Sequence, residues 1–170
     1  MFKRVDANID LPSVESEISA YWDKINAFET SVENRKNDKT FRFYDGPPFP
    51  TGSPHYGNLL AGVIKDIVPR YWTMRGYYVE RRFGWDVHGL PIEMEVQKKL
   101  NLEDPQQIDE YGIDKFNEAC RSQVQTNTEN WEKITRKIGR WVDFENDYKT
   151  MDIEFMESVW WVFKELWSKD

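Results

Sequence analysis

Cysteine is almost absent from this sequence, because only Cys120 among 170 residues carries a thiol. A single thiol excludes an internal disulfide and a zinc site built from several cysteines. No apolar run approaches the roughly 20 residues that a membrane-spanning helix needs. The amino-terminal residues 1–10 lack the apolar core of a signal peptide. These absences predict a cytoplasmic protein with no membrane span.

Positive charge is also scarce, with 23 Lys and Arg residues against 30 Asp and Glu residues and a net charge of −7. Proteins that bind the phosphate backbone of nucleic acids electrostatically are usually basic, so this chain alone is a poor candidate for nucleic-acid binding. The segment 46–91 nevertheless carries a net charge of +2, against −9 for the remainder. An anionic ligand is therefore expected near this segment. The aromatic content of 15% excludes a disordered low-complexity chain.

Glycine and proline are concentrated in the same segment, which holds seven of the nine glycines and six of the eight prolines. This density predicts tight loops between short strands and helices. Strands are expected over 41–44 and 77–83, with a loop over 45–56 and an amphipathic helix from 58 to about 75 between them. The polar side of that helix is expected to face solvent: Lys65, Asp66 and Arg70. Strand, helix and strand predict a βαβ unit with parallel strands.

The flanks of this unit are expected to be helical, since apolar residues recur at helical spacing over 13–30, 91–100, 114–138 and 152–169. The last stretch is rich in large apolar side chains, and the chain ends directly after it. A truncated chain whose missing part covers that surface is therefore expected. The predicted fold class is α/β, with a partial Rossmann-like nucleotide-binding fold flanked by amphipathic helices.

Both histidines of the sequence, His55 and His88, lie in the glycine- and proline-rich segment. His55 stands where the loop enters the helix, followed by Gly57 and Asn58. Helix amino termini offer unpaired backbone N–H groups, and a glycine there lets a flat ligand approach the backbone. The arrangement favours a nucleotide site. Neither G-x-G-x-x-G nor G-x-x-x-x-G-K-[ST] occurs, so the two common phosphate-binding motifs are excluded.

A second candidate group follows the second expected strand, with the sequence Gly84-Trp85-Asp86-Val87-His88-Gly89-Leu90-Pro91. Asp86 is placed to meet a cation of a ligand. Its side chain could equally cap the helix that begins near Leu90, and the residues alone leave both interpretations open. Trp85 is expected in the core, His88 is expected to act through its neighbours, and Arg81 and Arg82 are expected at the surface.

Two stretches resemble the class I aminoacyl-tRNA synthetases: Asp45-Gly46-Pro47-Pro48-Phe49-Pro50-Thr51-Gly52-Ser53-Pro54-His55-Tyr56-Gly57-Asn58 and Gly84-Trp85-Asp86-Val87-His88-Gly89-Leu90-Pro91-Ile92-Glu93. The second resembles the isoleucyl branch of that family. The resemblance implies that isoleucine and ATP, with Mg²⁺, form isoleucyl adenylate, and that the acyl group then moves to tRNA(Ile).

The resemblance also implies roles for individual residues. ATP would be bound by His55, Gly57 and Asn58, of which His55 and Asn58 would be catalytic. Isoleucine would be bound by Gly46, Pro47 and Asp86, with the Asp86 carboxylate on the α-ammonium. The family motif is H-x-G-H, and Asn58 stands in place of its second histidine, where it keeps a hydrogen-bond donor without a positive charge.

Three features that the resemblance implies for members of this family do not occur in these 170 residues: the editing insertion, the K-M-S-K-S loop and the zinc-binding cysteines. The expectation is an amino-terminal helical extension over 1–40 and the first part of the catalytic Rossmann domain over 41–170. Zinc is expected only in the full-length protein, and the fragment alone is expected to be inactive. Two alternatives remain: another nucleotidyltransferase with an H-x-G-H-like loop, or a non-catalytic nucleotide-binding or protein-interaction module.

Overall fold

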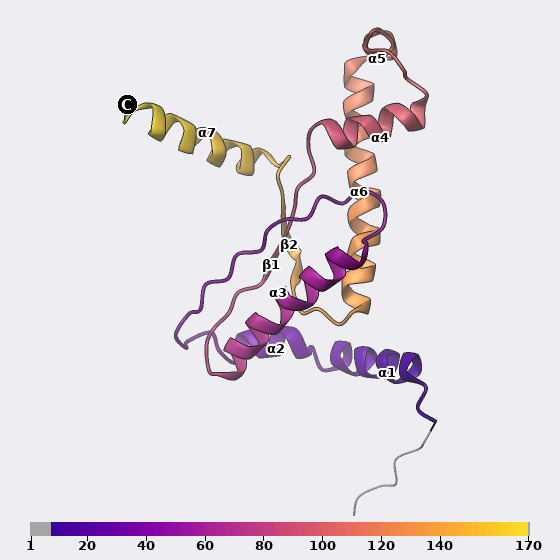
Figure 1. The fold of residues 1–170 in the computed structure, drawn as a ribbon. Coiled ribbons are helices and arrows are strands. Elements are labelled where there is room, and N and C mark those ends of the chain that lie inside the picture. Colours follow the sequence, from indigo (N-terminus) through magenta and orange to yellow (C-terminus); the bar gives the residue numbers. More distant parts are fainter. Residues whose placement is uncertain (1–7, 170) are drawn as a thin grey trace, which may run out of the picture.

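The computed structural model describes residues 8–169, so residues 1–7 of the expected extension and residue 170 lie outside the described part. The helices found there are α1 (Leu11–Lys24), α2 (Ala27–Glu33), α3 (Tyr56–Met74), α4 (Leu90–Leu100), α5 (Pro105–Tyr111), α6 (Ile113–Lys137) and α7 (Ile153–Trp167). The strands are β1 (Arg82–Trp85) and β2 (Asp143–Lys149), which form one parallel sheet (Figure 1). The chain is therefore α/β with parallel strands, as predicted.

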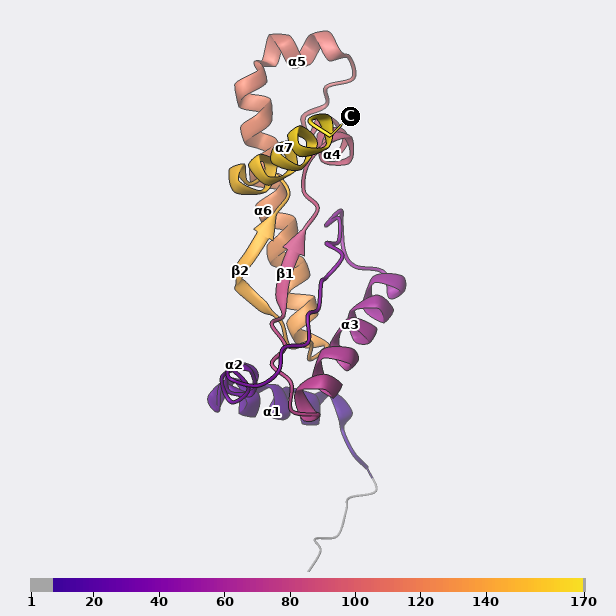
Figure 2. The ribbon, with the colours of Figure 1, turned by 90° about the vertical axis from the view of Figure 1, so that its left-hand side faces the viewer.

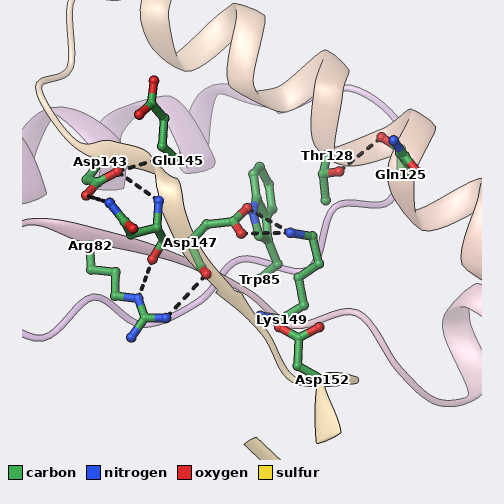
Figure 3. Close-up of polar contacts among 10 residues, drawn as sticks. Arg82, Trp85, Gln125, Thr128, Asp143, Glu145, Asp147, Lys149 and Asp152 are labelled. Atoms are coloured by element: carbon green, nitrogen blue, oxygen red, sulfur yellow. Dashed lines mark hydrogen bonds and ion pairs between the residues drawn. The ribbon is translucent and has the colours of Figure 1, made fainter. Parts of the chain in front are cut away.

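The parallel pair joins segments that are about 60 residues apart in the sequence. A side chain links the two strands, because Trp85 Nε1 donates to Asp147 Oδ2 at 2.6 Å. Within β2, Lys149 Nζ lies 2.7 Å from Asp147 Oδ1 and holds the same carboxylate (Figure 3). The ring of Tyr148 lies against Gly84, where a Cβ would come within 2.2 Å of Cζ. Gly84 is thus required by the close approach of the two strands.

The strand expected over 41–44 is not formed. One isolated parallel bridge joins Thr40 to Tyr78. Further along, the backbone N of Asp86 donates to Pro48 O at 2.9 Å. Figure 2 shows this segment running beside β1. The prolines at positions 47, 48 and 50 carry no N–H donor, which limits backbone pairing of the loop with the segment beside it. The second expected strand also begins later than predicted, at Arg82.

Sequence reasoning did not predict β2 or α5. It did predict α3, α4, α6 and α7, whose observed bounds lie close to the expected ones. The single helix expected over 13–30 is instead two helices, because Asn26 between them has a left-handed backbone with φ 46°. Such a residue cannot continue a right-handed helix.

The orientation of α3 is the reverse of the prediction. Its polar residues contact the rest of the chain, since Lys65 pairs with Asp45 and the Asp66 carboxylate accepts from Trp141 N at 3.0 Å. Its apolar side chains are exposed: Leu60, Val63, Ile64, Ile67, Val68, Tyr71 and Met74. The charged side chains of α3 turn inward because their partners, Asp45 and the Trp141 backbone, lie elsewhere in the chain. Apolar periodicity within the helix does not reveal those partners.

The hydrophobic core lies between the sheet and helices α4 and α6. Its members are Phe83, Trp85, Val87, Ile92, Val96, Phe116, Val124, Trp131, Val142 and Phe144. Trp85 is 1% exposed, so its predicted place in the core is confirmed. Helix α7 extends away from this body, and its large apolar side chains are exposed (Figure 1). Within residues 8–169, no helix is both long and apolar enough to cross a bilayer.

Candidate functional site

The amino end of α3 is closed by a reciprocal capping arrangement between His55 and Asn58. The Nδ1 atom of His55 accepts from Gly57 N at 3.1 Å, and His55 N donates to Asn58 Oδ1 at 3.0 Å. Because Nδ1 acts as an acceptor, the ring proton is on Nε2 of the exposed imidazole. His55 therefore offers an N–H donor to solvent at the positive end of a helix dipole.

Gly57 gives the His55 ring the space for this cap. A Cβ on Gly57 would lie 3.0 Å from His55 Cε1 and 3.1 Å from Nδ1. Asn58 has a second task that sequence reasoning missed, because its side-chain oxygen satisfies the backbone N–H of His55. The pattern of a polar N-cap residue and an amide three positions later is a capping-box signal that could have revealed it.

A buried carboxylate anchors the loop that precedes α3. The Asp45 side chain is 1% exposed and forms ion pairs with Arg140 and with Lys65, whose Nζ lies 2.6 Å from Asp45 Oδ1. The same Nζ donates to Gly46 O at 2.8 Å. Further along the loop, Trp131 Nε1 donates to Gly52 O at 2.8 Å. The loop is thereby fixed to α3 on one side and to α6 on the other.

A cavity of about 160 Å³ lies beneath this loop. Its walls include Pro48, Asn58, Lys65, Phe83, Trp131 and Arg140. Ligand pockets commonly measure about 300–1,000 Å³, so this space is too small for a nucleotide. It brings Asn58 near the anchored loop, whereas His55 and Asp86 are not among its walls.

Asp86 follows β1 directly, at the carboxyl end of the strand. Its backbone N donates to Pro48 O, which holds it beside the loop that carries Gly46 and Pro47. Helix α4 begins after Gly89, which has φ 86°, and no side chain caps it. The alternative that Asp86 caps this helix is therefore wrong, and the half-buried carboxylate is left for another role.

Thr150, at the end of β2, contacts three consecutive residues of the segment after β1. Its hydroxyl oxygen accepts from Val87 N at 3.0 Å, lies 2.6 Å from His88 Nδ1, and lies 3.4 Å from Asp86 Oδ1. Thr150 N also donates to Trp85 O at 3.0 Å. Sequence reasoning missed Thr150, because nothing in the local sequence links it to residues more than 60 positions earlier.

The expected site residues thus form two groups that the loop 45–54 connects. Gly46, Pro47 and Asp86 are held together through Pro48, while His55, Gly57 and Asn58 form the amino end of α3. Within residues 8–169, no hydrogen bond or ion pair joins His55 to Asp86. Figure 2 shows the connecting loop running along β1 before it turns into α3.

Arg81 departs from its predicted place at the surface. It is 3% exposed, lies over the ring of Phe28, and donates from Nη2 to Thr73. Desolvation by burial lowers the pKa of Arg81 to about 10. Arg82 is exposed, as predicted, and donates from Nε to Asn146 O (Figure 3). Part of the positive charge of residues 46–91 is therefore buried.

Comparison with known proteins decides the family. Residues 17–170 match the tRNA synthetases class I (I, L, M and V). The chain belongs to this family. This class I synthetase chain is 52% identical over 169 residues to the isoleucine–tRNA ligase of Treponema denticola, covering 99% of the chain and 15% of that protein. It is 55% identical over 159 residues to the cytoplasmic isoleucine–tRNA ligase of Arabidopsis thaliana, covering 94% of the chain and 13% of that protein.

A solved structure supports the same fold. The class I synthetase chain resembles LeuRS of Agrobacterium radiobacter, solved in a ternary complex with tRNA and LeuAMS, with a TM-score of 0.68 and 20% identity. The match covers 95% of this chain and 18% of that one. The likeness confirms the partial Rossmann-like fold. The class I synthetase chain thus spans about 15% of the length of the curated relatives it matches.

Proposed function

We propose that these residues form the amino-terminal part of an isoleucine–tRNA ligase. The observation that carries the proposal is identity of 52–55% to curated isoleucine–tRNA ligases over nearly the whole chain. In this proposal residues 1–40 are a helical extension, and residues 41–170 are the first part of the catalytic domain, before the editing insertion. Neither the rival nucleotidyltransferase nor the non-catalytic module accounts for such identity.

Isoleucine would bind at the carboxyl end of β1. The Asp86 carboxylate would pair with the α-ammonium, an interaction between opposite charges that is stronger than a neutral hydrogen bond. Gly46 would leave room beside the substrate, since no atom lies within 4 Å of where its Cβ would be. Pro47, next to it, would supply a rigid wall to the pocket.

ATP would bind at the amino end of α3. The exposed Nε2–H of His55 would donate to a phosphate oxygen, and Gly57 would let the nucleotide approach the backbone. The amide nitrogen of Asn58, which takes no part in the helix cap, would donate to ATP as well. When the isoleucine carboxylate attacks the α-phosphorus, pyrophosphate leaves. Donors fixed in advance by the cap would stabilise the negative charge that develops.

Metal ions enter this proposal only with ATP or from other parts of the protein. Among residues 8–169, no group of three or more His, Cys, Asp and Glu side chains is arranged to hold a metal ion. These residues therefore do not fit a zinc site of three or more protein ligands. Mg²⁺ would arrive bound to the phosphates of ATP, and zinc would belong to the full-length protein outside these residues.

The remaining partner is tRNA(Ile), which would receive the isoleucyl group in the full-length protein. The solved relative is described in complex with tRNA, and the Arabidopsis relative is named as cytoplasmic. We propose the cytoplasm for this protein too.

The test is isoleucine-dependent exchange of pyrophosphate into ATP by the full-length ligase. The substitution Asp86→Ala should raise the KM for isoleucine at least tenfold, because a charge-assisted contact is lost. The substitution His55→Ala should instead lower kcat, since it removes a phosphate donor. Exchange that depends on a different amino acid would refute the proposal.

A further inference from the structure

Thr150 contacts Asp86, the proposed ligand of the isoleucine ammonium, and the two residues that follow Asp86. The residue is 6% exposed, and its hydroxyl lies within 3.4 Å of Asp86, Val87 and His88 atoms. It comes from the end of β2, which pairs with β1. The inference below rests on the proposed role of Asp86.

The chemistry of a hydroxyl accounts for all three contacts at once. A hydroxyl has two acceptor lone pairs and one proton to donate. One lone pair accepts from Val87 N at 3.0 Å, and the other accepts from His88 when its ring proton is on Nδ1, at 2.6 Å. The hydroxyl proton is then directed to Asp86 Oδ1, 3.4 Å away. In this arrangement His88 orients the hydroxyl, and the hydroxyl holds the carboxylate.

We propose that Thr150 is a positioning residue, whose hydroxyl fixes the Asp86 carboxylate in the orientation that receives the isoleucine ammonium. It acts through Asp86 and does not touch the substrate. The contact also ties the amino-acid site to the pairing of β1 with β2, since Thr150 N donates to Trp85 O one residue before Asp86.

The experiment compares variants of the full-length ligase in pyrophosphate exchange. Thr150→Val keeps the shape of the side chain but removes the hydroxyl. We expect the KM for isoleucine to rise about five- to tenfold, with the KM for ATP unchanged. The rise is smaller than a full hydrogen bond to a charged group would give, because the hydroxyl lies 3.4 Å from the carboxylate oxygen. Thr150→Ser, which keeps the hydroxyl, should restore an isoleucine KM within about twofold of the parent.

Thr128→Val is the matched control. Thr128 is also buried, but its hydroxyl donates only to Gln125 O within α6 (Figure 3). This variant should leave the isoleucine KM unchanged. If Thr150→Val does not fold, Thr150→Ser against Thr150→Ala asks the same question, because these two side chains differ only in the hydroxyl.

The outcomes separate this inference from the proposed function. An isoleucine KM that rises in Asp86→Ala but not in Thr150→Val would overturn the role of Thr150 and leave the proposed function standing. Equal KM values for Thr150→Ser and Thr150→Ala would overturn it as well. An unchanged KM in Asp86→Ala would overturn the isoleucine role of Asp86, and the role of Thr150 with it.

Discussion

Lys65 and Asp45 form an ion pair at 2.6 Å that joins the third turn of α3 to the start of the preceding loop. The Asp45 carboxylate is almost wholly buried, and the same lysine nitrogen also holds the Gly46 carbonyl. Asp45 Oδ1 has no hydrogen-bond partner of suitable geometry, so the Lys65 contact is an ion pair without a hydrogen bond. This ion pair connects α3 to the loop that precedes it.

Lys65→Met should lower the free energy of unfolding by about 2 kcal/mol, because a buried carboxylate loses one of its two cationic partners. Denaturant unfolding of the chain, followed by tryptophan fluorescence, measures this change. Lys98→Met is the matched control, since Lys98 is an exposed lysine on α4. A Lys65→Met loss no larger than the Lys98→Met loss would contradict the anchoring role.

Gly84→Ala should destabilise the chain by about 3 kcal/mol, because the added methyl group would overlap the Tyr148 ring. The same unfolding measurement applies. In a Tyr148→Ala background the substitution should cost much less, since the ring that it meets is gone. Gly46→Ala is the control, because open space surrounds that position. Equal costs of Gly84→Ala in both backgrounds would exclude the Tyr148 ring as the cause.

Cys120 should react slowly with iodoacetamide at mildly alkaline pH. Burial raises the pKa of its thiol above the ordinary value of 9.0, and the charge of Glu93 raises it further. The thiolate is the reactive form, so the midpoint of the rate against pH should lie above 9.0. Because the thiol pKa is higher in the folded chain than in the unfolded one, this group stabilises the fold less as pH rises through that range.

Glu93→Gln should lower this midpoint, because it removes a negative charge that opposes the thiolate. Glu118→Gln is the control on the same helix as Cys120, and it should leave the midpoint of the alkylation rate unchanged. A midpoint below 9.0 in the parent chain would show that the thiol is not held in a desolvated environment.

The 170-residue chain alone should give negligible isoleucine-dependent pyrophosphate exchange. These residues lack the K-M-S-K-S loop that the family uses as its second phosphate-binding element. The assay should compare the chain with the full-length ligase at equal concentration. Strong exchange by the purified 170-residue chain would refute this prediction.

The sequence predicted the helices well, because their signals are local. Pro91 at the start of α4 and Gly76 just after α3 mark helix ends through their own backbone preferences. It failed at strand β2, whose sequence is polar and which becomes a strand only beside the distant β1. It also missed the break at Asn26, a local backbone feature that apolar periodicity does not show.

The same distinction applies to the site. His55, Gly57 and Asp86 could be chosen from a loop, a helix start and a strand end, which are visible in a few neighbouring residues. The Asp45 ion pairs and the Thr150 contacts could not, since Arg140 lies 95 positions from Asp45 and Thr150 lies 64 from Asp86. The inward orientation of Lys65 and Asp66 follows from such remote partners.

The pairing of β1 with β2 has a consequence for how the chain is made. During synthesis from the amino terminus, β1 leaves the ribosome long before Asp147 and Thr150, the residues to which it is bonded. A nascent chain that stops short of them carries Asp86 at the end of an unpaired strand, and the indole N–H of Trp85 lacks its Asp147 acceptor. Translation must therefore pass residue 150 before the carboxyl end of β1 can acquire its final shape.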